Sequence, residues 1–100
     1  MSDYNNRQYH LMLEQLHDFE TKRIDLKHLI NGLESLLECL EKVAPDWRSN
    51  FQHHWGVLED VYADALDRGY KELPETSNKL LVEAVRNLKI MVEDKHDGNQ

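Results

Sequence analysis

The sequence has little of several residue types that define particular protein classes. Among its 100 residues are one cysteine, two prolines and four glycines. The cysteine, Cys39, cannot form an internal disulfide, which excludes a disulfide-stapled scaffold and agrees with a reducing compartment. No internal repeat and no low-complexity tract appears.

Long apolar runs are absent as well. No stretch approaches the roughly 18 apolar residues of a membrane-spanning helix. The opening segment, MSDYNNRQYH, has neither the cationic start nor the apolar run of a secretion signal. We therefore expect a cytoplasmic protein that does not act on a membrane.

Basic residues are too few to balance the acidic ones. The chain has 12 lysines and arginines against 19 aspartates and glutamates, a net charge of −7. This field repels nucleic acid phosphates and anionic lipid and attracts cationic surfaces. Direct nucleic acid binding is therefore not expected, and a basic partner is favoured.

Apolar residues recur at helical spacing in four segments, of which the first two lie in the N-terminal half. The first helix is predicted over Asn5–Glu20. Asp25 is placed to cap a second, leucine-rich helix that extends to Val43. Gly32 inside this helix marks either a close approach of a neighbouring helix or a tolerated glycine.

Proline and glycine punctuate the C-terminal half. Pro45 suits the first turn of a helix, so a third helix is predicted from there to Arg68. Gly69 then tolerates the left-handed conformation that ends a helix. A fourth helix is predicted after Pro74, with Thr76 or Ser77 as its cap.

These segments predict the fold class. No strand-like alternation appears, and short connections make successive helices antiparallel neighbours. We expect an all-α protein, a single domain over residues 1–100 in the form of an antiparallel bundle of about four helices. Its short termini, including residues 97–100, are expected to fray. Trp47 and Trp55 share a stripe with Phe51 and are predicted to anchor the core.

The best metal-site candidate is Glu14-Gln15-Leu16-His17, because Glu-x-x-His on a bundle helix presents two ligands of a di-iron centre on one face. Such a site needs a second copy of the motif. The chain offers only Asp25-Leu26-Lys27-His28, whose His28 points away from its leucine stripe. The motif is therefore interpreted as a solvated polar edge.

The remaining candidate metal ligands and nucleophiles do not have the spacing that a metal or catalytic site requires. Adjacent His53 and His54 diverge by 100° on a helix and cannot chelate one ion without distortion. His53 is expected to point outward and His54 to border the core, while Cys39 is expected to be a half-buried structural thiol. No zinc, phosphate-loop or nucleophile-elbow motif occurs. We expect no catalytic, cofactor or metal site, and hence no enzyme.

Negative charge is concentrated between residues 34 and 67. Eight acidic residues there oppose two basic ones, so this part of the chain holds six of the seven net negative charges. Since the rest of the chain is nearly neutral, partner binding is predicted in this part of the chain. The candidate partner-binding residues are Glu34, Glu38, Glu41, His53, Glu59, Asp60, Asp64 and Asp67.

Most of these residues form two ridges with the same i, i+4, i+7 spacing. The α-helical periodicity places Glu34, Glu38 and Glu41 on one ridge, and Asp60, Asp64 and Asp67 on the other. Like charges at this spacing repel by about 0.2–0.5 kcal/mol per pair, and acidic residues near a helix C-terminus oppose the macrodipole. A function that needs concentrated negative charge explains them; a solvated face is the alternative. The two helices are expected to be antiparallel, which sends their C-terminal halves to opposite ends. The ridges then form two separate acidic lobes, and one continuous patch is the alternative.

Three stretches give the chain a resemblance to a known group of proteins. They are LMLEQLHDFETKRIDLKHLINGLESLLECLE, the segment from Trp47 through FQHHWGVLEDVYADALDRG, and LLVEAVRNLKIMV. In pattern and composition the chain resembles the small, acidic, helical immunity proteins of bacterial polymorphic and contact-dependent growth inhibition toxin systems. The resemblance implies an intracellular antidote that binds and neutralises the C-terminal domain of a cognate toxin, typically a nuclease with a basic cleft.

Such immunity proteins diversify their contact residues, so the ridge residues are proposed on charge alone. Two alternatives stay open. One is a helical adaptor or regulatory protein that binds another basic protein, and the other is a metal-dependent helical-bundle enzyme. A metal assay on the purified protein tests the enzyme hypothesis. A large secreted protein with a variable C-terminal domain, encoded immediately upstream, would favour an immunity protein over an adaptor.

Overall fold

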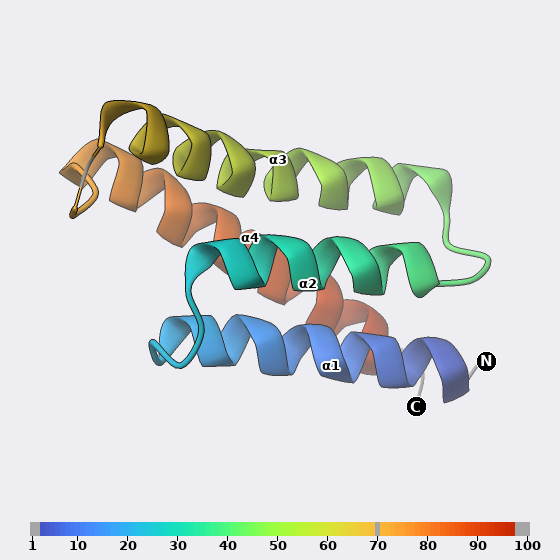
Figure 1. The fold of residues 1–100 in the computed structure, drawn as a ribbon. Helices are drawn as coiled ribbons and strands as arrows, with labels where there is room; N and C mark the ends of the chain where they lie inside the picture. The colour runs from blue at the N-terminus through green and yellow to red at the C-terminus, as the bar shows by residue number, and fades with distance from the viewer. Residues whose placement is uncertain (1–2, 70, 98–100) are drawn as a thin grey trace.

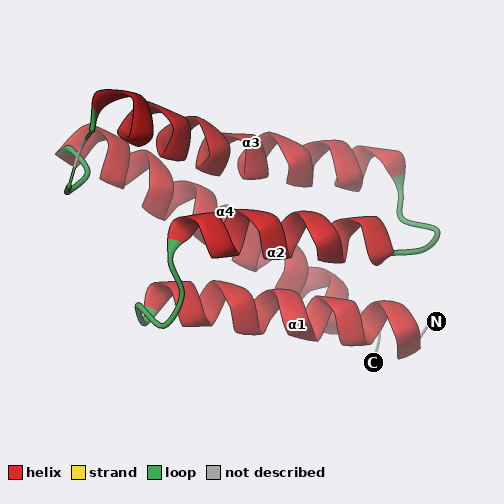
Figure 2. Cartoon of the chain, viewed as in Figure 1, coloured by secondary structure: helices red, strands yellow, loops and turns green. Residues whose placement is uncertain are grey.

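A computed structural model of the chain describes residues 3–69 and 71–97. These residues form four helices and no strand (Figure 2). The helices are α1 (Asp3–Glu20), α2 (Leu26–Cys39), α3 (Pro45–Arg68) and α4 (Glu75–Asp97). The predicted all-α fold is confirmed.

Successive helices alternate in direction and pack against their neighbours in the chain. Helices α1, α2 and α3 follow one another side by side, and α4 crosses behind them from the end of α3 to the start of α1 (Figure 1). The contact between α4 and α1 closes the bundle. Helices α3 and α4 also continue beyond the α1–α2 turn (Figure 1). No described helix has the length and apolar character needed to cross a membrane.

The core draws on every helix. Its fully buried large side chains include two from each, namely Met12, Leu16, Leu29, Leu33, Phe51, Leu58, Leu88 and Val92. The expectation for the tryptophans is only partly met, because Trp47 and Trp55 pack against this core while remaining partly exposed. The Trp55 indole Nε1 donates a hydrogen bond to the Ile30 carbonyl at 2.9 Å. That polar end has to stay at the edge of the α2–α3 contact.

Helix α2 begins as predicted and ends earlier. The Asp25 carboxylate accepts a hydrogen bond from the His28 N–H at 2.8 Å. The helix stops at Cys39, and Leu40 is already extended with φ −69° and ψ 141°. The prediction of a helix to Val43 is therefore wrong. Arg48 from α3 donates to the Leu37 carbonyl at 3.2 Å, so a tertiary contact satisfies the helix end.

The ends of α3 and α4 follow the proline and glycine signals, with one correction. Gly69 has φ 68° and ψ 31°, the left-handed conformation predicted for it. Helix α4 begins at Glu75, so Thr76 and Ser77 lie in its first turn and do not cap it. The Pro74 carbonyl already accepts the first helical hydrogen bond at 2.9 Å. The helix continues through Asp97, and residues 98–100 of the predicted tail lie outside the described residues.

Gly32 marks a close approach between α1 and α2. A Cβ atom at this position would lie 2.7 Å from Gln15 Oε1, a side-chain atom of α1. A side chain at position 32 would therefore occupy the space that the Gln15 amide fills. Of the two interpretations of Gly32, the structure favours the close approach.

Candidate functional site

Three acidic residues of α3 lie at the end of the bundle where α3 turns into α4. Asp60 and Asp67 are exposed and Asp64 is half-buried. Arg68 Nε donates to Asp64 Oδ1 at 2.9 Å in an exposed ion pair. Asp60 and Asp67 pair with no cation among the described residues. We call Asp60, Asp64 and Asp67 the α3 lobe, a surface that keeps most of its negative charge uncompensated.

An exposed leucine lies on the same part of α3. The Leu66 side chain is 65% exposed, more than any other exposed large apolar residue that the structure describes. It lines a hollow of about 330 Å³ between α2 and α3. The other lining residues are Lys27, Ile30, Asn31, Glu59, Tyr62 and Ala63. Glu59 is exposed, so this hollow combines an apolar surface with a further carboxylate close to the α3 lobe.

The other predicted ridge is broken in the structure. Glu34 and Glu38 are exposed on α2, whereas Glu41 lies beyond the helix, in the α2–α3 turn. Asn5 Nδ2 donates to the Glu41 carbonyl at 2.6 Å, and the Glu41 N–H donates to Asn5 Oδ1 at 2.9 Å. A contact with α1, not helical register, therefore positions Glu41. Because α2 and α3 are antiparallel, Glu41 and the α3 lobe lie at opposite ends of the hairpin, which favours two lobes (Figure 1).

His53 and His54 adopt the orientations expected from the sequence. His53 is exposed and His54 is half-buried, with their ring centroids 5.3 Å apart and their planes at 73°. Burial lowers the pKa of His54, and the neighbouring His53 charge lowers it further. The pair thus favours a neutral His54.

The residues of the metal hypothesis lie on the surface. Glu14 and His17 are both exposed, and the Glu14 carboxylate instead lies 3.0 Å from His10 Nε2. Within residues 3–69 and 71–97, no group of three or more histidine, cysteine, aspartate or glutamate side chains is placed to hold a metal ion. The Glu-x-x-His spacing therefore belongs to a solvated edge of α1.

Cys39 differs from its prediction. The thiol is exposed, not half-buried, because Cys39 lies roughly 200° around α2 from the buried Leu37. A side-chain hydrogen bond between Tyr4 and Cys39 is the main cause that raises the pKa of the Tyr4 hydroxyl. The two side chains link the end of α2 to the start of α1.

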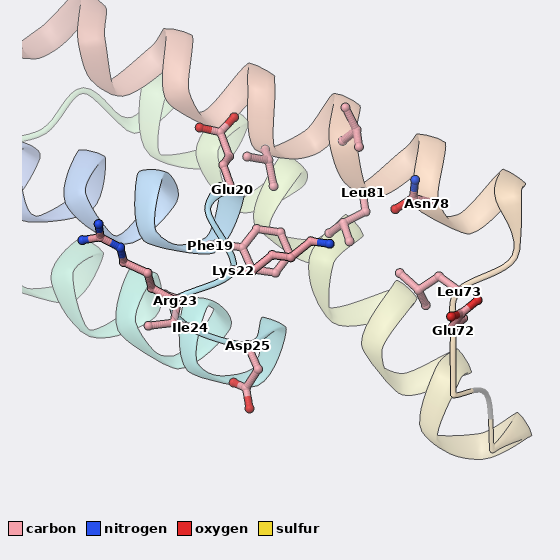
Figure 3. Close-up of a pocket in the computed structure, with 12 residues that line it drawn as sticks. Phe19, Glu20, Lys22, Arg23, Ile24, Asp25, Glu72, Leu73, Asn78 and Leu81 are labelled. Atoms are coloured by element: carbon pink, nitrogen blue, oxygen red, sulfur yellow. The ribbon is translucent and has the colours of Figure 1, made fainter.

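A groove that the sequence did not predict lies between the α1–α2 turn and the first half of α4. Its volume is about 970 Å³. Of its lining residues, Leu81 and Val85 are buried and Phe19, Ile24 and Leu73 are half-buried. Figure 3 shows Phe19, Ile24, Leu73 and Leu81 around it. The remaining lining residues are Glu20, Lys22, Arg23, Asp25, Glu72, Asn78 and Val82.

Two sequence signals accompany this groove. Ile24 and Leu73 are apolar residues inside connections, where no helical stripe accounts for them. Val82 on α4 is 49% exposed and lies outside the buried stripe. These residues become one site only because α3 and α4 extend past the α1–α2 turn, which no periodicity reveals.

The chain was compared with known protein families, with curated proteins and with solved structures, and none of them matches. Its function therefore has to be inferred from its own residues and their geometry.

Proposed function

We propose that this protein is an immunity protein that binds and neutralises the C-terminal domain of a cognate bacterial toxin. The expected toxin domain is a nuclease with a basic active-site cleft. The observation that carries the proposal is the α3 lobe, in which Asp60 and Asp67 are exposed and have no ion pair among the described residues, on the same stretch of α3 as the exposed Leu66. The pattern resemblance to immunity proteins supports it independently.

This combination suits a protein interface. Tight interfaces depend on a few apolar or aromatic anchors, surrounded by polar groups that exclude water. Leu66, with Tyr62 beside it in the hollow, provides such an anchor. The carboxylates of Glu59 and of the α3 lobe attract a cationic surface before contact and raise the association rate. An antidote that must capture its toxin quickly benefits from both properties.

Neutralisation follows from the chemistry of the cleft. A nuclease binds phosphates through lysine and arginine, and these cations bind carboxylates as well. Asp60, Asp64 and Asp67 repeat along about two turns of α3, so a row of carboxylates can occupy a row of phosphate-binding groups. Inhibition then requires only that the toxin bind the α3 lobe more tightly than its nucleic acid.

The test replaces the three aspartates of the α3 lobe with lysine. Lysine near the C-terminus of α3 suits the helix macrodipole and relieves carboxylate repulsion. Loss of the exposed Arg68–Asp64 pair opposes this gain by about 0.3–0.5 kcal/mol, so the stability should change little. Three cations opposed to a basic cleft should abolish binding, because like-charge juxtaposition costs several kcal/mol. Thermal unfolding measures the first effect. Survival of cells that express the toxin domain encoded immediately upstream measures the second.

The matched control changes Glu34, Glu38 and Glu41 to lysine, which alters the same number of charges at the other end of the hairpin. We expect it to protect cells more effectively than the α3-lobe variant. A Leu66→Asp variant should lose protection without loss of fold. Wild-type protection by both triple variants would refute the acidic interface. Tight binding of a basic protein without protection from any toxin would instead indicate an adaptor.

A further inference from the structure

The groove between the α1–α2 turn and α4 is lined by apolar and by charged or polar residues in equal number. Leu81 and Val85 are only 5% and 4% exposed, whereas Val82 beside them is 49% exposed. Its volume of about 970 Å³ lies within the range of pockets that bind ligands. Phe19, Ile24 and Leu73 are half-buried along it, so the groove offers partly accessible apolar side chains.

Most charged groups around the groove already have partners. Lys89 Nζ donates to Glu20 Oε1 at 3.1 Å. Arg23 lies 4.0 Å from the Asp18 carboxylate, and the Arg23 N–H donates to the Asp18 carbonyl at 2.7 Å. These groups are engaged within the chain and do not call for a ligand.

Lys22 is different. It has no ion pair within the described residues, and its backbone adopts a left-handed conformation with φ 66°. Its N–H is bonded to the Phe19 carbonyl at 3.1 Å, which fixes the turn. Figure 3 shows its side chain crossing the Phe19 ring, with the ammonium directed toward Leu81. A cation without an ion pair among the described residues thus lines one side of the groove.

The opposite wall carries an acidic residue. Glu72 lies beside Leu73 on the α3–α4 turn, across the groove from Lys22 (Figure 3). A ligand that satisfies both walls needs an anionic group on one edge, a cationic group on the other and an apolar surface between them. A fatty acid has one charge and meets only half of this pattern. An amphipathic helix meets all of it.

We propose that this groove binds an amphipathic helix of a partner protein, with an acidic residue on the edge facing Lys22 and a basic residue on the edge facing Glu72. The apolar residues of that helix, spaced at i, i+3 or i+4 and i+7, pack against Leu81, Val82 and Phe19. The site is separate from the α3 lobe and does not depend on the proposed toxin.

The probe is a synthetic helical peptide of about 14 residues, or four turns, with leucines along one face, glutamate on one edge and lysine on the other. Nuclear magnetic resonance titration of the full chain measures binding and locates it. We expect a Kd below about 1 mM, with the shifts concentrated on Leu81, Val82 and Phe19. Absence of peptide binding at about 1 mM peptide would overturn the proposal. Stronger binding of dodecanoate than of the peptide would overturn it as well.

Paired variants separate the groove from the rest of the surface. Val82 and Ile90 are both exposed apolar residues of α4, at 49% and 56%, and only Val82 lines the groove. Val82→Asp should weaken peptide binding at least about tenfold, while Ile90→Asp should leave it unchanged. Circular dichroism confirms that each variant keeps its helices. Equal effects of the two substitutions would refute the site.

Charge reversal at two lysines tests whether Lys22 contributes to peptide binding. Lys22→Glu should weaken peptide binding about fivefold and strengthen the binding of a peptide with lysine on both edges. Lys27→Glu is the matched control, because Lys27 is exposed and does not line the groove. An equal loss in both variants would show only long-range attraction and would overturn the role of Lys22. The α3-lobe variant should bind the peptide normally, so failure of this proposal is distinguishable from failure of the proposed function.

Discussion

Phe51 should contribute more to stability than either tryptophan. Its side chain is fully buried at 0% exposure and contacts Trp47, with ring centroids 5.3 Å apart. Phe51→Ala removes a ring from a closed core and should cost about 3–5 kcal/mol, from lost transfer energy and the cavity left behind. Trp55→Ala should cost about 2 kcal/mol, because it removes one hydrogen bond and only partial apolar burial.

Urea unfolding followed by far-ultraviolet circular dichroism measures both variants on the same scale. Phe51→Leu, which retains most of the buried carbon, is the control and should lose about 1 kcal/mol. Trp55→Phe isolates the indole hydrogen bond to the Ile30 carbonyl and should lose about 1 kcal/mol. A larger loss for Trp55→Ala than for Phe51→Ala would refute the placement of Phe51 at the centre of the core.

Two further predictions concern local contacts. Asn5→Ala removes both hydrogen bonds to the Glu41 backbone and should lower the free energy of unfolding by about 1 kcal/mol. The Glu41 amide should also exchange faster with solvent, and an unchanged exchange rate would contradict the role of these two hydrogen bonds. Because burial and His53 lower the pKa of His54, the unfolded chain binds a proton more readily than the folded one, so stability should fall as the pH drops below about 6.5. His54→Gln should reduce this loss, as measured by thermal unfolding at a series of pH values.

Local signals in the sequence predicted the elements well. The apolar spacing, the Asp25 cap and the Gly69 stop each depend on residues within one or two turns, and the structure confirms all three. The early end of α2 was missed because it depends on residues distant in sequence. Asn5 binds the turn at Glu41, and Arg48 satisfies the helix end.

The site was predicted less completely for a similar reason. Charge spacing indicated the α3 lobe, because Asp60, Asp64 and Asp67 lie on a single helix. It gave no indication of Leu66 as an apolar anchor or of the groove under Lys22. The hollow at Leu66 depends on how α2 packs against α3. The groove depends on relative helix lengths and on the path of α4, which brings together residues from two turns and two helices.

The path of α4 has a consequence for how the chain folds. Contacts of α2 join helices adjacent in the sequence, whereas α4 also contacts α1, and the pair formed by Glu20 and Lys89 spans 69 positions. During synthesis from the N-terminus, α1, α2 and α3 emerge before α4, so the apolar residues that α4 covers stay in water. Helix α1, whose Met12 and Leu16 are fully buried in the closed bundle, contacts both α2 and α4. The nascent chain therefore passes through a stage with an open apolar face, and docking of its last helix ends that exposure.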